Sequence, residues 1–249
     1  MGEIKVNVYD AGGADEYDEK SHFDKGDRER QRQYLADVTG FLNKEIKLVI
    51  ELGCGTGFFT ETLLQLCPAA KIVALDGAGS MLALAREKLA GRDQQVLYRQ
   101  CDLRSADLLE WQGAAELVFS AFTLCFLSSA ERAAIIRQSW QALAEGGALL
   151  IIDQFLPASQ QARELVEYLA CRDLQRRFAA FLGAPLTAPS LALDKIIAMD
   201  RKQKLHDGER ETSIEEHVTL VRAAGFDECH EVFRDGRVFG LLAIKGAAS

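Results

Sequence analysis

The chain lacks several features that would assign it to a compartment or to a metal-dependent class. Its six cysteines include no C-x-x-C pair, and its four histidines show no ligand spacing such as H-x-x-x-H, so we expect no metal site. No apolar run approaches the roughly 18 residues that a membrane-spanning helix needs, and the first residues lack the pattern of a secretory signal. We therefore expect a cytoplasmic protein with reduced cysteines and no membrane contact.

Positive charge is also scarce, with 29 basic against 37 acidic residues and a net charge of −8. Nucleic acids and anionic membranes usually demand a basic surface, so neither is expected as a partner. The two basic clusters, at residues 28–32 and 172–177, alternate with acidic or apolar residues at helical spacing. This alternation favours solvated helix faces over an RNA-binding surface.

What is present is a regular alternation of apolar segments and helical patterns across the 249 residues. Strands are predicted near residues 47–52, 71–76, 95–100, 116–121 and 147–153, and helices near 27–43, 57–66, 79–90 and 129–144. Such alternation is typical of parallel strands joined by right-handed crossovers, with helices on both faces. The start is harder to interpret, although Ile4, Val6 and Val8 alternate as in a short strand.

The pattern changes after the fifth predicted strand. Residues 158 to about 205 read as helical with a break at 183–189, and a further helix is predicted near 213–224. Two final strands, near 227–233 and 237–245, are joined by the turn pair Asp235-Gly236. The hairpin adds an antiparallel strand, which ordinary dinucleotide dehydrogenases lack.

A glycine-rich segment follows the first predicted strand. Glu51 ends the strand, Gly53, Gly55 and Gly57 alternate with other residues, and Asp76 ends the next strand. This is the layout of a nucleoside-type cofactor site, in which glycines admit the ligand and a carboxylate takes two ribose hydroxyls. A NAD site would carry its last glycine where Phe58 stands, and the Gly-Lys-Ser/Thr ending of a P-loop is absent.

The segment resembles motif I of the class I S-adenosylmethionine (SAM) methyltransferases, and the resemblance runs in register over roughly residues 47 to 153. Asp76 with Met81-Leu82 resembles the second motif of the family, Cys101-Asp102-Leu103 the third, and residues 116–122 the fourth. Residues 143–151 are similar to its "L-x-x-G-G" turn into strand five. The resemblance implies a Rossmann-like, doubly wound α/β sheet of seven strands, the last antiparallel, which the predicted hairpin independently supports.

By this resemblance the cofactor is SAM, and its product S-adenosylhomocysteine. The acid at the second strand tip holds the ribose, the third motif reads the adenine edge, and the fourth lies beside the methionyl part. The cofactor-binding residues implied are Glu51, Gly53, Gly55, Gly57, Asp76, Gly77, Met81, Asp102, Leu103, Ser120 and Phe122.

The catalytic residues are less clear. Some relatives carry a His-His pair after the fourth motif, where this chain has Cys125-Phe126, so the obvious base is missing. Three candidates remain. Tyr17 lies in a Tyr-Asp pair that resembles a segment folding over the cofactor. Asp153 ends the fifth strand, where open α/β sheets place substrate contacts. His217 lies on the late helix.

Residues 1–45 are expected to form an N-terminal segment and helix that cover the cofactor site. Residues 46–249 would form the SAM-binding domain, with a helical lid insertion at about 156–210. Apolar side chains of that insertion favour a small or medium organic acceptor, methylated at oxygen or nitrogen, and the fourth motif lacks the Asn/Asp-Pro-Pro-aromatic signature of nucleobase methylation. A SAM-using enzyme of another type, as in the carboxy-SAM synthases, and a non-catalytic SAM-binding relative remain alternatives. A monomer or homodimer is expected.

Overall fold

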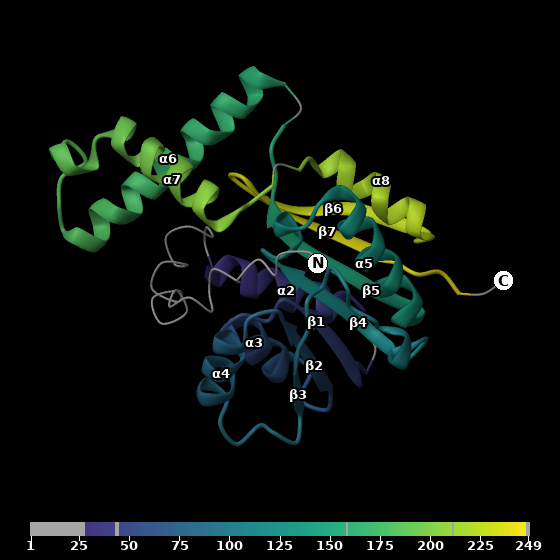
Figure 1. Cartoon of the computed structure of the whole chain (residues 1–249). Helices are drawn as coiled ribbons and strands as arrows, with labels where there is room; N and C mark the ends of the chain where they lie inside the picture. The colour runs from purple at the N-terminus through teal and green to yellow at the C-terminus, as the bar shows by residue number, and fades with distance from the viewer. Residues whose placement is uncertain (1–27, 43–44, 158, 211, 248–249) are drawn as a thin grey trace, which may run out of the picture.

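The structure is a computed structural model that describes residues 28–42, 45–157, 159–210 and 212–247 (Figure 1). The predicted strand at residues 4–8 and the candidate Tyr17 lie outside these ranges. Among the helices described, none combines the length and the apolar character that crossing a bilayer requires.

Seven strands form one sheet in the order β3-β2-β1-β4-β5-β7-β6. The strands are β1 (Leu48–Leu52), β2 (Lys71–Asp76), β3 (Val96–Gln100), β4 (Ala115–Ala121), β5 (Leu143–Gln154), β6 (Glu228–Asp235) and β7 (Val238–Ile244). The first five pair in parallel, and β7 runs antiparallel to both of its neighbours. The predicted Rossmann-like sheet with an antiparallel last strand is confirmed.

Helices cover both faces of this sheet. They are α2 (Arg28–Leu42), α3 (Phe58–Leu66), α4 (Gly79–Lys88), α5 (Ser129–Ala142), α6 (Gln160–Leu182), α7 (Leu193–Asp207) and α8 (Ile214–Ala224), with short 3₁₀ turns at Leu109–Trp111, Leu124–Phe126 and Pro189–Leu191. Successive strand residues point to opposite faces. Val49 therefore joins the core beneath α2, α3 and α4, and Ile50 the core beneath α5 and α8. Both faces of the central strands are buried, which explains their continuous apolar sequences.

The insertion after β5 is a pair of long helices that extends away from the sheet (Figure 1). Ser159 caps α6 by accepting from Ala162 N–H at 3.2 Å, and Gly183 ends the helix with φ +59°. Helices α6 and α7 pack on a small core of their own, around Cys171, Leu174 and Ile196. This core is separate from the two that sandwich the sheet.

One predicted boundary is wrong. The fourth predicted helix was expected to reach residue 144 and the fifth strand to begin near residue 147, but α5 ends at Ala142 and Leu143 already pairs with Ala115 as the start of β5. Gly146 and Gly147 therefore lie within the strand. Its early start follows from an irregular register between Ala115 and Leu117, which the apolar pattern does not reveal.

Candidate active site

The glycine segment forms a loop that bends back over the end of β2. The N–H groups of Gly53 and Cys54 both donate to the carbonyl of Leu75, at 2.8 and 2.9 Å. Gly53 and Gly55 have φ of +76° and +53°, a region that residues with a Cβ rarely adopt. The loop therefore presents bare main chain at the carboxyl edge of the sheet, where open α/β folds bind ligands.

Asp76 is joined directly to this loop. Its Oδ2 accepts from Gly55 N–H and its Oδ1 from Ala78 N–H, both at 2.8 Å. The two partners lie on different sides of the β2 tip in sequence, so the carboxylate fixes the glycine loop and the start of α4 together. A carboxylate at the tip of the second strand is also the group that would accept the two hydroxyls of a ligand ribose.

Glu51 is a buried acid beneath the loop, with 2% of its surface exposed. Burial raises its pKa to about 8; the hydrogen bond from Thr60 Oγ1, at 2.6 Å, opposes the rise and the nearby charge of Asp76 adds to it. Glu51 is therefore mostly protonated at neutral pH. A cationic ligand group placed beside it would favour the charged form.

The other predicted cofactor residues lie around the same edge. Met81 and Leu103 are buried, and Gly77 receives a hydrogen bond from Gln100 on its carbonyl at 3.2 Å. Ser120 is buried, with its hydroxyl 3.4 Å from the carbonyl of Leu52. Gly57 precedes α3, with φ +82°.

Asp102 is placed differently from these residues. It is exposed, and Arg104 binds its carboxylate in a fork, with Nε 2.8 Å from Oδ1 and Nη2 2.7 Å from Oδ2. The hydrogen bonds from the Arg104 side chain hold the pKa of Asp102 below its usual value, against a smaller effect of burial. An adenine that contacts this carboxylate would have to share it with Arg104.

Phe122 has φ +52°, and it is the one residue other than glycine with positive φ in the described ranges. A bulky side chain in that region carries strain, which is typical of functional sites. Its ring lies 5.8 Å from the guanidinium of Arg28, which also lies over Phe58 at 3.9 Å. Arg28 is 7% exposed, so the prediction of a solvated basic face is wrong at this residue. The aromatic partners of Arg28 come from segments distant in the sequence, so no local sequence pattern predicts these contacts.

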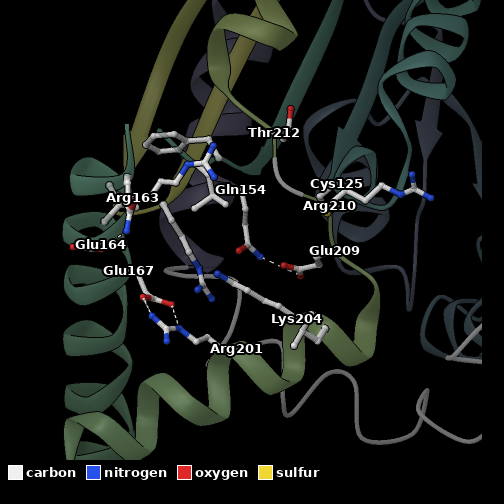
Figure 2. Close-up of a pocket in the computed structure, with 16 residues that line it drawn as sticks. Cys125, Gln154, Arg163, Glu164, Glu167, Arg201, Lys204, Glu209, Arg210 and Thr212 are labelled. Carbon is white, nitrogen blue, oxygen red and sulfur yellow. Dashed lines mark hydrogen bonds and ion pairs between the residues drawn. The ribbon is translucent and has the colours of Figure 1, made fainter. Parts of the chain in front are cut away.

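A cavity of about 500 Å³ lies between the tips of β4 and β5 and the two helices of the insertion. Cys125 and Gln154 line it from the strand tips, and Arg163, Arg201 and Lys204 line it from α6 and α7 (Figure 2). None of the predicted cofactor residues is among its lining residues. The site therefore has two parts, a glycine-loop edge at β1 and β2 and a partly open chamber beside β4 and β5.

Two of the catalytic candidates lie next to the chamber rather than in it. Asp153 is fully buried; its Oδ2 accepts from Cys125 N–H at 3.0 Å and its Oδ1 from Gln154 N–H at 2.8 Å. It thereby fixes the backbone of two cavity-lining residues.

His217 is also fully buried, and its ring packs against Phe239 with 5.1 Å between centroids. Burial lowers its pKa to about 4, so it is neutral at physiological pH. Its Nδ1 lies 3.1 Å from the Ser213 carbonyl and 3.3 Å from the hydroxyl of Thr212, a residue that lines the cavity. No group of three or more His, Cys, Asp or Glu side chains suited to a metal ion occurs in the described part of the chain.

Comparison with known proteins shows which proteins this chain resembles. Residues 49–147 match the family model of a methyltransferase domain. The chain is 33% identical over 158 residues to a trans-aconitate 2-methyltransferase of Acidovorax sp. (strain JS42), covering 61% of this chain and 56% of that protein. It is 26% identical over 203 residues to a carboxy-S-adenosyl-L-methionine synthase of Photorhabdus laumondii subsp. laumondii, covering 80% and 73%.

A solved SAM-dependent methyltransferase from Aquifex aeolicus shares the fold. Its TM-score is 0.58 at 18% sequence identity, over 96% of this chain and 99% of that one. The chain spans 56% of the length of the first curated relatives that it matches. The family model spans β1 to β4 and the start of β5, including the glycine loop.

Proposed function

We propose that this chain, which carries a methyltransferase domain over residues 49–147, is a class I SAM-dependent methyltransferase that transfers a methyl group from SAM to an oxygen or nitrogen of a small or medium organic acceptor. The observation that carries this proposal is the joining of Asp76 to the glycine loop through Gly55 N–H at 2.8 Å. It brings a diol acceptor and exposed main chain to one edge. A Cβ added to Gly55 would meet nothing within 4 Å, so there is room for a ligand against the loop.

The residues around this edge fit the three parts of the cofactor. Asp76 would accept hydrogen bonds from the two ribose hydroxyls, and Glu51 would pair with the ammonium of the methionyl part. Met81 and Leu103 offer apolar surface to the adenine, with the Asp102–Arg104 pair at its rim. When bound, the cofactor supplies a methyl group already activated on a sulfonium.

What remains for the chain is to hold the acceptor in line and to exclude water. We propose that the insertion at about residues 156–210 does this, since α6 and α7 form one wall of the chamber at the tips of β4 and β5. Asp153 would act through its hold on Cys125 and Gln154, and Thr212 connects the chamber to the neutral ring of His217. The predicted cover over the cofactor site, residues 1–45, falls mostly outside the described ranges.

Isothermal titration with SAM and with S-adenosylhomocysteine tests the proposal, with NAD as the control ligand. Both adenosyl compounds should bind with one-to-one stoichiometry, and NAD should not. If neither adenosyl compound binds, the proposal fails.

A second candidate is a SAM-using enzyme of another reaction type. The alignment to a carboxy-SAM synthase over 80% of this chain supports this second candidate. Mass spectrometry of the cofactor that co-purifies with the protein separates the two candidates, because a carboxylated cofactor has a different mass from SAM.

Binding of SAM should release a proton at neutral pH. Glu51 has a pKa of about 8 in the ligand-free protein and would have to ionise to pair with an ammonium. The release at pH 7 should approach about one proton per SAM, and affinity should rise with pH up to about 8. Titrations in buffers of different ionisation enthalpy measure this number.

Glu51→Gln is the matched variant, because it keeps the shape and the bond to Thr60 but cannot ionise. It should bind SAM more weakly and without this proton release. An equal release from the wild-type protein and from Glu51→Gln would show that another group is responsible.

A further inference from the structure

The chamber beneath α6 and α7 is lined by basic side chains, although the chain as a whole has a net charge of −8. Arg163 comes from α6, Arg201 and Lys204 from α7, and Arg237 from the turn between β6 and β7. Three separate elements therefore contribute cations to one cavity.

Acidic groups offset this charge only in part. Glu167 pairs with Arg201 through two hydrogen bonds of 2.7 and 2.6 Å. Asp200 is shared, because Arg237 donates to both of its oxygens at 2.8 Å while Lys204 Nζ lies 3.3 Å from Oδ2. A lysine ammonium has three donors, and Asp200 engages one of them.

The remaining charged residues of the wall do not change the balance. Glu209 lies within the chamber, 3.4 Å from Gln154 Nε2. Glu164 is exposed and hydrogen-bonds Gln160 at 3.1 Å, and in Figure 2 both Glu164 and Arg210 are directed away from Lys204. The inner wall therefore has four cations, Arg163, Arg201, Lys204 and Arg237, against three acids, Glu167, Asp200 and Glu209.

Burial strengthens part of this positive charge, although the Arg201 side chain itself is 61% exposed. The side chains of Arg237 and Asp200 are 10% and 4% exposed. Burial alone would raise the pKa of Asp200, but Arg237 and Lys204 outweigh it and the pKa is lowered, so the pair stays charged. The side chain of Lys204 is 27% exposed, so it is only partly in contact with water. Charge–charge interactions are stronger in such a space than at an open surface.

We propose that the methyl acceptor held in this chamber is an acid, and that Lys204, with the guanidinium groups of Arg163 and Arg201, binds its carboxylate or phosphate group. This inference rests on the proposed function, because the acceptor site is taken to be the chamber at the β4 and β5 tips. Figure 2 shows Arg201 and Lys204 approaching from α7, with Cys125 and Thr212 across the chamber. An acid bound to α7 would direct its remaining atoms toward the strand tips.

Matched acids and amides test this proposal by titration into the full chain saturated with S-adenosylhomocysteine. The probes are benzoate against benzamide, glutarate against glutaramide, and phenyl phosphate. At least one carboxylate should bind about tenfold more tightly than its amide, because an anion gains charge-assisted hydrogen bonds. Tight binding of phenyl phosphate alone would assign the acid as a phosphate ester.

Lys204→Met removes the ammonium and keeps the alkyl stem. It should weaken acid binding about tenfold and leave the amides and S-adenosylhomocysteine unaffected. Lys202→Met is the matched control, because Lys202 is an exposed lysine of the same helix that does not line the chamber. It should change none of these affinities.

The proposal is overturned if acids and amides bind equally, if no acid binds, or if Lys204→Met binds acids as the wild type does. The same titrations without S-adenosylhomocysteine keep the two questions apart. Acid binding that depends on Lys204, in a protein that fails to bind S-adenosylhomocysteine, would support the anion site and contradict the methyltransferase assignment.

Discussion

Asp76→Ala should weaken the binding of SAM and of S-adenosylhomocysteine by about 30- to 150-fold, which corresponds to a loss of roughly 2–3 kcal/mol. The variant removes the proposed acceptor of the two ribose hydroxyls. It also removes the groups to which Gly55 N–H and Ala78 N–H donate. Isothermal titration at one pH and ionic strength measures the change.

Two further variants show whether weaker binding comes from loss of the ribose acceptor or from loss of the hydrogen bonds to the backbone. Asp93→Ala is the control, because Asp93 is an exposed acid in the turn before β3, and it should bind as the wild type does. Asp76→Asn keeps one carbonyl oxygen for the backbone but loses the charge, so it should fall between the wild type and Asp76→Ala. Binding by Asp76→Ala within about twofold of the wild type, with an unchanged melting curve, would remove the ribose role from this residue.

The sheet was predictable because its information is local. Buried parallel strands read as continuous apolar runs, and the glycines and acids that follow them mark the strand ends. The Asp235-Gly236 pair likewise marked the final hairpin, whose turn glycine has φ +57°. Each of these features depends on a few neighbouring residues, so a single sequence reveals it.

The charged lining of the chamber beneath α6 and α7 was not predictable in the same way. Arg237 and Asp200 lie 37 positions apart, and only the packing of α7 against the hairpin makes them a buried pair. Arg28 shows the same limit. The alternating charges of residues 28–32 predict a solvent-exposed helix face, but the aromatic partners of Arg28 come from α3 and from the tip of β4. Long-range pairing of charged residues leaves no periodic signal.

Asp102 marks a different limit. The third-motif resemblance predicts an adenine contact at this residue, but nothing in Cys101-Asp102-Leu103 indicates that Arg104 holds its carboxylate. A motif gives the residue type and the place along a strand. Whether another side chain already hydrogen-bonds to that residue depends on the loop conformation.

Gly53→Ala should destabilise the protein by about 2–5 kcal/mol and prevent SAM binding. Two costs add: an alanine at φ +76° loses about 1–2 kcal/mol, and overpacking loses typically 1–3 kcal/mol. The added Cβ would collide with the side chain of Thr123, whose Cγ2 would lie at 2.5 Å and Cβ at 2.8 Å. Relief of that collision would displace the loop that Leu75 and Asp76 hold. Urea unfolding measures the stability, and titration measures the binding.

Gly91→Ala separates the two costs, because Gly91 has φ +88° and a Cβ there would meet nothing within 4 Å. It should lose only the conformational part, about 1–2 kcal/mol, and bind SAM normally. Adding Thr123→Ala to Gly53→Ala removes Oγ1 and Cγ2 from the collision and should recover part of the stability. Since Thr123 directly follows Phe122, this double-mutant cycle also measures how strongly the glycine loop is coupled to the strained tip of β4. Equal losses of unfolding free energy from Gly53→Ala and Gly91→Ala would mean that the glycine loop can shift away from Thr123 at no energetic cost. Close packing against Thr123 would then not determine the shape of the loop.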